Sequence, residues 1–153
     1  MKNLFLLLLL IPLISFSQDY LVFVGDKSYT SSYGLTFDNI YDDVFVSFVK
    51  TDNGDAIYLE TNYIYDDNPK IIKPLTLYLS NGDVLISKSA MVTDYVDKNC
   101  ISIYPLTESD ISALKVYDLI RIRFTISPSS SYGDDINRFA SSDEDTSESL
   151  KDF

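Results

Sequence analysis

The apolar residues of this chain fall into short runs that are interrupted by turn residues. One run, Val44 to Val49, is continuous enough to predict a strand that is buried on both faces. In the last run, Ile120 to Ile126, branched or aromatic residues alternate with Arg121, Arg123 and Thr125, which predicts a strand with one buried and one wet face. The other predicted strands cover residues 20–24, 56–65, 75–79, 84–87 and 100–104.

Two Asn-Gly pairs separate predicted strands, at Asn53-Gly54 and at Asn81-Gly82. Asn and Gly tolerate the positive φ angles of a type I′ turn, so each pair predicts a β-hairpin. Residues 29–33 read instead as a loop or a ragged edge.

One helix is predicted near residues 107–117, after Pro105 ends a strand. Thr107 has the side chain to cap the helix, and Asp110 completes a variant of the capping box. The helix either makes a crossover within one sheet or caps the end of a sandwich. We therefore expect a mainly β fold (α+β at the margin), an antiparallel β-sandwich-like single domain with one short helix.

The first seventeen residues contain in order Lys2, an apolar run and a small-x-small triplet, Ser15-Phe16-Ser17. This order is typical of a secretory signal peptide over residues 1–17. The apolar run, Leu4 to Ile14, is shorter than a membrane-spanning helix requires, so we expect release into the periplasm or the medium without membrane insertion.

The charge of the expected mature chain limits its partners. Without residues 1–17 it keeps 11 basic and 23 acidic side chains, a net charge of −12. Nucleic acid and anionic lipid are repelled by such a field, whereas a basic protein or a divalent cation is attracted.

The chain has no histidine and a single cysteine, Cys100. These counts exclude Ser-His-Asp and Cys-His catalysis and His-ligated zinc. Cys100 lies in an apolar run, so we expect a small buried hydrophobic residue, not a reactive thiol.

Residues 127–153 are rich in serine and acidic residues and poor in apolar ones. Such a composition buries too little surface to offset the entropy of ordering. We therefore expect the β-rich domain to cover residues 18–126 and an acidic, disordered tail to follow it.

The stretch Tyr104-Pro105-Leu106-Thr107-Glu108-Ser109-Asp110-Ile111, followed by Leu114 and Ile120-Arg121-Ile122-Arg123, resembles the C-terminal element of short exported proteins of unknown function from Bacteroidota-type bacteria. The resemblance covers residues 104–124. It implies a β-rich exported domain and carries over no catalytic or binding residue.

Two pairs of side chains form the candidate binding face. Tyr63 and Tyr65 share one face of a predicted strand and offer contact area to a protein or glycan, although aromatic residues also simply favour strands. Arg121 and Arg123 share a face of the last strand. They suit a carboxylate or phosphate, or cross-strand pairing with aspartates.

Carboxylates leave two further chemistries open. Acidic residues at the turns, such as Asp52, Asp55 and Asp83, supply oxygen ligands for calcium, but no stretch has EF-hand spacing. A small hydrolase needs two converging carboxylates, and only Glu60 lies within a predicted strand. We expect no cofactor, no metal site and no catalytic residue.

The functional expectation is an exported, non-enzymatic binding module that engages a basic protein. The alternatives are a small carboxylate-dependent hydrolase and an envelope-associated structural protein. An enzyme requires a concave site with converging carboxylates, whereas a binding module requires an exposed aromatic or charged face.

Overall fold

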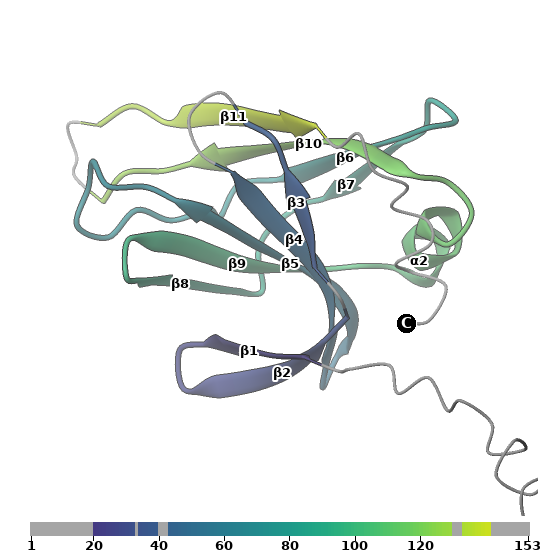
Figure 1. The fold of residues 1–153 in the computed structure, drawn as a ribbon, viewed down its shortest axis with the longest axis horizontal. Coiled ribbons are helices and arrows are strands. Elements are labelled where there is room, and N and C mark those ends of the chain that lie inside the picture. Colours follow the sequence, from purple (N-terminus) through teal and green to yellow (C-terminus); the bar gives the residue numbers. More distant parts are fainter. Residues whose placement is uncertain (1–19, 33, 40–42, 130–132, 142–153) are drawn as a thin grey trace, which may run out of the picture.

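The structure, a computed structural model, describes residues 20–32, 34–39, 43–129 and 133–141. These residues form eleven strands and one helix, in an order that Figure 1 follows along the chain. The elements are β1 (Tyr20–Val24), β2 (Lys27–Ser31), β3 (Leu35–Phe37), β4 (Val44–Thr51), β5 (Gly54–Asn62), β6 (Leu75–Leu79), β7 (Val84–Ser87), β8 (Val92–Val96), β9 (Asn99–Pro105), α2 (Glu108–Leu114), β10 (Leu119–Ile126) and β11 (Ile136–Ser141). The predicted signal peptide lies outside the described residues.

The strands form two antiparallel sheets, which confirms the predicted mainly β fold. Sheet A has the strand order β1-β2-β4-β5-β9-β8, with β3 paired to β4. Sheet B has the order β11-β10-β6-β7. Residues from both sheets build one large core cluster, so the two sheets pack face to face.

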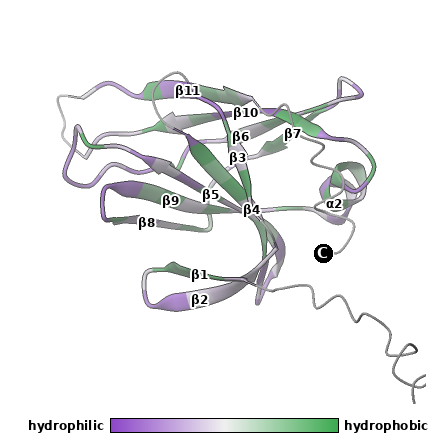
Figure 2. Ribbon diagram, in the orientation of Figure 1, coloured by the Kyte–Doolittle hydropathy of each residue, from purple (hydrophilic) through white to green (hydrophobic). Residues whose placement is uncertain are grey.

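Sheet A is buried on both of its faces in its centre. Figure 1 shows the β1–β2 hairpin on the side of β5 and β9 that faces away from sheet B. Val24 and Tyr29 of this hairpin belong to a second core cluster, together with Tyr58 and Ile103. The turn of the hairpin is fixed to β8, because the Gly25 amide donates to Asp94 Oδ2 over 2.7 Å. This packing accounts for the mostly apolar sequence of β4, whose first part is green in Figure 2.

Sheet B is buried on one face only, as the alternation in β10 predicts. Ile122, Phe124 and Ile126 are buried, and Arg121 and Arg123 are exposed. Ile120 does not follow this pattern and is exposed, because a register irregularity between Leu119 and Arg121 turns Leu119 into the core in its place.

The helix α2 has the capping box that the sequence predicts. Thr107 Oγ1 accepts a hydrogen bond from the Asp110 amide, and Asp110 Oδ2 accepts one from the Thr107 amide. The helix ends at Leu114, three residues before the predicted end. It connects β9 of sheet A to β10 of sheet B and is therefore not a crossover within one sheet.

Within the described ranges, no helix has the length and apolar composition needed to span a bilayer.

Both predicted hairpins are confirmed, but their turns differ from the predicted type. In the described residues, positive φ angles outside glycine occur only at Asp97 and Lys98, so neither Asn53 nor Asn81 adopts the type I′ conformation. The glycines that follow them do have positive φ angles, +114° at Gly54 and +90° at Gly82. The Asp97-Lys98 pair joins β8 to β9, with φ angles of 50° and 70° that fit a type I′ turn.

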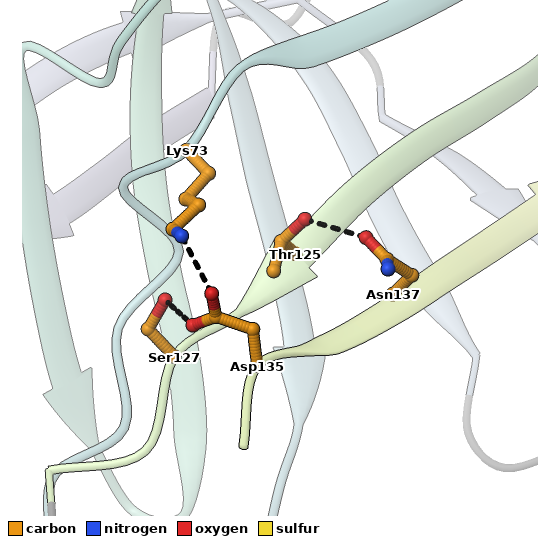
Figure 3. A network of polar contacts seen from close by, with 5 residues as sticks. All are labelled: Lys73, Thr125, Ser127, Asp135 and Asn137. Carbon is orange, nitrogen blue, oxygen red and sulfur yellow. Dashed lines mark hydrogen bonds and ion pairs between the residues drawn. The ribbon is translucent and has the colours of Figure 1, made fainter. Parts of the chain in front are cut away.

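The expected domain boundary at residue 126 is wrong. Strand β11 pairs with β10 along its whole length, and its Ala140 is buried in the core. Figure 3 shows how polar contacts fix the chain before β11, where Asp135 accepts from both Lys73 and Ser127 over 2.5 and 2.7 Å. The domain therefore continues to Ser141. Residues 142–153 of the predicted tail lie outside the described residues.

Candidate functional site

A concave surface lies on the face of sheet A that points away from sheet B. The β1–β2 hairpin covers one part of this face, and the part beside it is hollowed. This hollow has a volume of about 500 Å³. Its lining residues are Thr36, Asp43, Phe45, Glu60, Thr61, Asn62 and Asn99.

Glu60 is held in a fixed position in this hollow. Its Oε2 accepts a hydrogen bond from the Tyr58 hydroxyl over 2.7 Å, and its Oε1 accepts one from Asn99 Nδ2 over 2.7 Å. Asn62 Nδ2 donates to Asn99 Oδ1 over 3.2 Å and extends the network. Since Tyr58, Glu60 and Asn62 alternate along β5, they lie on one face of the sheet.

The Tyr58 hydroxyl acts as a hydrogen-bond donor to the Glu60 carboxylate. Burial raises the pKa of Tyr58, and the hydrogen bond to Glu60 raises this pKa further. The phenol therefore stays protonated at physiological pH and acts as a donor. Because both oxygens of Glu60 already accept a hydrogen bond, the side chain is preorganised before any ligand arrives.

Phe45 separates this hollow from a second one. The second hollow, of about 350 Å³, lies between β1, β2 and β3. Its lining residues are Tyr20, Leu21, Val22, Ser31, Ser32, Gly34, Thr36 and Phe45. The Phe45 ring packs closely on Gly34. A Cβ atom added to Gly34 would lie 1.8 Å from Cζ of Phe45. Thr36 and Phe45 line both hollows, and we call the two hollows together the groove.

The groove has an acidic end and an apolar end. Two carboxylates, Asp43 and Glu60, line the first hollow, and neither hollow has a lysine or arginine among its described lining residues. The aromatic ring of Phe45 lies between the two hollows. An ammonium or guanidinium group matches the acidic end, because carboxylates and aromatic faces both attract cations. An aliphatic stem or neighbouring apolar side chain matches the other end.

Tyr63 and Tyr65, which we expected to form an exposed pair, differ in burial. Strand β5 ends at Asn62, and Tyr63 then turns into the core, where it is 6% exposed. Tyr65 is 76% exposed, and its ring makes an edge contact with Tyr63 at a centroid distance of 5.5 Å. The aromatic platform therefore consists of Tyr65 alone.

Arg121 and Arg123 do lie together, on the open face of sheet B. Arg121 Nε donates to Ser141 Oγ over 3.4 Å, and Arg123 Nη2 donates to Thr76 Oγ1 over 3.3 Å. Within the described residues they therefore donate to hydroxyl groups, and neither forms the ion pair with an aspartate that cross-strand pairing would supply. The two arginines lie on β10 of sheet B, whereas the two tyrosines lie in the segment that follows β5 of sheet A.

Cys100 is fully buried, as the sequence predicts. Burial raises the pKa of its thiol to about 12, so the thiolate is scarcely populated at neutral pH. No group of three or more metal-binding side chains occurs within the described residues, which include the turn aspartates considered for calcium.

The sequence pointed to Glu60 as a strand carboxylate but did not indicate its surroundings. Phe45 and Asn99 are brought to Glu60 by strand pairing, Phe45 directly opposite Glu60 and Asn99 opposite Asn62. Neither residue type carries a chemical signal of its own in the sequence.

No protein-family model, curated protein or solved structure matches this chain.

Proposed function

We propose that this chain is an exported, non-enzymatic binding module that holds a basic segment of a partner protein in the groove. One observation carries the proposal: Glu60 is fixed by Tyr58 and Asn99 in a hollow that also contains Asp43 and no described basic residue. The net charge of −11 adds a long-range attraction for a basic partner. Export remains an expectation from residues 1–17 and from the resemblance of residues 104–124.

The expected mode of binding uses both ends of the groove. A lysine or arginine head group meets Glu60 and Asp43, its stem lies along the Phe45 ring, and the next apolar side chain enters the second hollow. The groove is open, so the ligand is an extended chain segment and not a small molecule enclosed on all sides.

A hexalysine peptide is a suitable first probe, measured by calorimetric titration with the chain of residues 18–153. We expect binding that weakens with added salt. Glu60→Gln removes the charge and keeps the shape, and we expect it to weaken binding by about tenfold or more, since a hydrogen bond to a charged group contributes about 1.5–3 kcal/mol.

Asp52→Asn is the matched control, because it removes the same charge from an exposed turn outside the groove. We expect it to change affinity by less than about twofold, since an exposed charge contributes little. Equal losses in both variants would contradict the proposal and indicate attraction to the overall charge only. Circular dichroism would verify that Glu60→Gln keeps the fold.

A carboxylate-dependent hydrolase is the second candidate, because Asp43 and Glu60 line one hollow. It differs from the binding module in one measurable respect. Turnover of a chromogenic glycoside panel that is lost in both Asp43→Asn and Glu60→Gln would favour the hydrolase.

A further inference from the structure

The outer face of sheet B carries two arginines between apolar side chains. The register places Phe139, Arg123, Thr76 and Ile86 in one row across the four strands. Figure 1 shows sheet B as the outermost layer, with no described element beyond it. Phe139 is 50% exposed and Ile86 is 60% exposed, so this face is open to solvent.

The adjacent row has the same character. It contains Ser141, Arg121, Tyr78 and Val84, of which Tyr78 is half-buried and the other three are exposed. We call the two rows together the arginine face. An open sheet face of this kind, with apolar and cationic residues mixed, is typical of an interaction surface.

Neither guanidinium group forms an ion pair with a carboxylate in the described part of the protein. Among the described residues, Arg121 and Arg123 donate hydrogen bonds to the hydroxyl oxygens of Ser141 and Thr76 instead. This is unusual in a chain with 23 acidic and 12 basic side chains, where carboxylate partners are plentiful. Arginine side chains in this state bind carboxylates through two parallel hydrogen bonds.

The spacing of the two arginines selects the form of the ligand. Residues two apart on one strand are separated by about 7 Å along the strand. Carboxylates at positions i and i+2 of an extended peptide have the same separation and also point to one side. We propose that the arginine face binds an extended acidic peptide segment of a partner protein, with Asp or Glu at alternate positions.

The apolar residues of the face complete this recognition. Phe139 flanks Arg123 on β11, and Ile86 lies beyond Thr76 on β7. Side chains next to the two carboxylates pack on these residues, which contributes affinity that salt does not screen. The site is independent of the groove, because its residues come from sheet B and those of the groove come from sheet A and the segment before β4.

The test uses a fluorescein-labelled peptide of alternating Glu and Ser, titrated with the chain of residues 18–153 and followed by fluorescence anisotropy. A peptide with Glu at every third position and the same total charge is the spacing control. We expect the alternating peptide to bind at least about fivefold more tightly, because only its carboxylates match both arginines.

Two double variants with equal charge changes separate the face from the net charge. Arg121→Gln with Arg123→Gln should weaken binding by at least about tenfold, as expected when charge-assisted hydrogen bonds are lost. Lys27→Gln with Lys115→Gln, at exposed sites outside the face, should change it by less than about twofold. Equal losses in the two variants would overturn the proposal, as would equal affinity for the two peptides.

Two other occupants would be recognised in the same experiment. The segment 142–153 contains Asp143, Glu144 and Asp145 and follows Ser141 of the face directly. Binding that appears only after Asp143→Asn, Glu144→Gln and Asp145→Asn would assign the face to this segment and overturn the partner proposal. Self-association that the arginine variant abolishes would assign it to a second copy, with the same consequence.

Discussion

Sheet A and sheet B are both antiparallel, but they differ in how many of their faces other elements cover. This difference in coverage determines where each sheet can bind a partner. The centre of sheet A is covered by sheet B on one side and by the β1–β2 hairpin on the other. A binding site on sheet A is therefore confined to the uncovered part of one face, where the groove lies. The described elements cover sheet B on one side only and leave its outer face open.

The same difference is visible in the sequence pattern of the two sheets. Val44 to Val49 is apolar at nearly every position because both faces of β4 meet other elements. Ile122 to Ile126 alternates because only one face of β10 does. A continuous run thus indicates a central layer, and alternation indicates an outer layer.

The largest expected effect concerns the buried layer. Phe48→Ala removes a fully buried ring in β4, and we expect a loss of about 3–5 kcal/mol in the free energy of unfolding. Ile86→Ala on the open face of sheet B should cost well under about 1 kcal/mol, since that side chain is already mostly in water. Urea denaturation of both variants measures this comparison, and similar losses would refute it.

The second effect concerns the reactivity of Cys100. The thiol is buried between the sheets, and burial raises its pKa to about 12. We expect Ellman's reagent at pH 8 to react at least about a hundredfold more slowly with the native chain than with the urea-unfolded chain. Rapid reaction in the native state would show that the sheets separate easily at β9.

The third effect tests the wall of the groove. A Cβ at residue 34 meets the Phe45 ring, so Gly34→Ala should reduce stability by about 1–3 kcal/mol. In a Phe45→Ala background this additional cost should vanish, because the ring that causes the clash is absent. An unchanged cost in that background would show that the glycine is required for another reason.

These three experiments examine regions that the sequence predicted to different extents. It indicated the strands with apolar runs, the helix cap and the burial of Cys100, because each depends on local chemistry. It missed β2, which is largely polar, β3, which has only three residues, and β8. Pairing with neighbouring strands supports the strand conformation of all three.

The tail and the tyrosines were misjudged for a related reason. Ile136, Arg138 and Ala140 of β11 alternate inside a polar segment, so average composition concealed a strand. Tyr63 and Tyr65 keep the spacing of a strand after β5 has ended, and the bend of the chain then separates their environments. Tertiary packing decided both outcomes, and no local pattern reports it.

The smallest expected effect concerns the ion pair that holds the chain before β11. The hydrogen bond from Lys73 lowers the pKa of Asp135, and the one from Ser127 lowers it further. A lowered pKa contributes stability above the unfolded value of about 3.9, and this contribution is lost as the pH falls through the native pKa.

We therefore expect Lys73→Met to be slightly less stable than the parent chain at pH 7, and the difference to shrink below about pH 4. Thermal unfolding of the two chains between pH 7 and pH 2 measures it. A gap that widens in acid would contradict the assigned role of the pair.

The central claim, that the groove on sheet A receives a basic segment, is tested most directly by mapping a hexalysine titration onto the chain with ¹⁵N NMR. We predict the largest shifts at Phe45, Glu60, Asn62 and Asn99, saturating together, with small shifts at the turn aspartates Asp52 and Asp83. Shifts spread evenly over the exposed carboxylates, without a maximum at the groove, would contradict the claim.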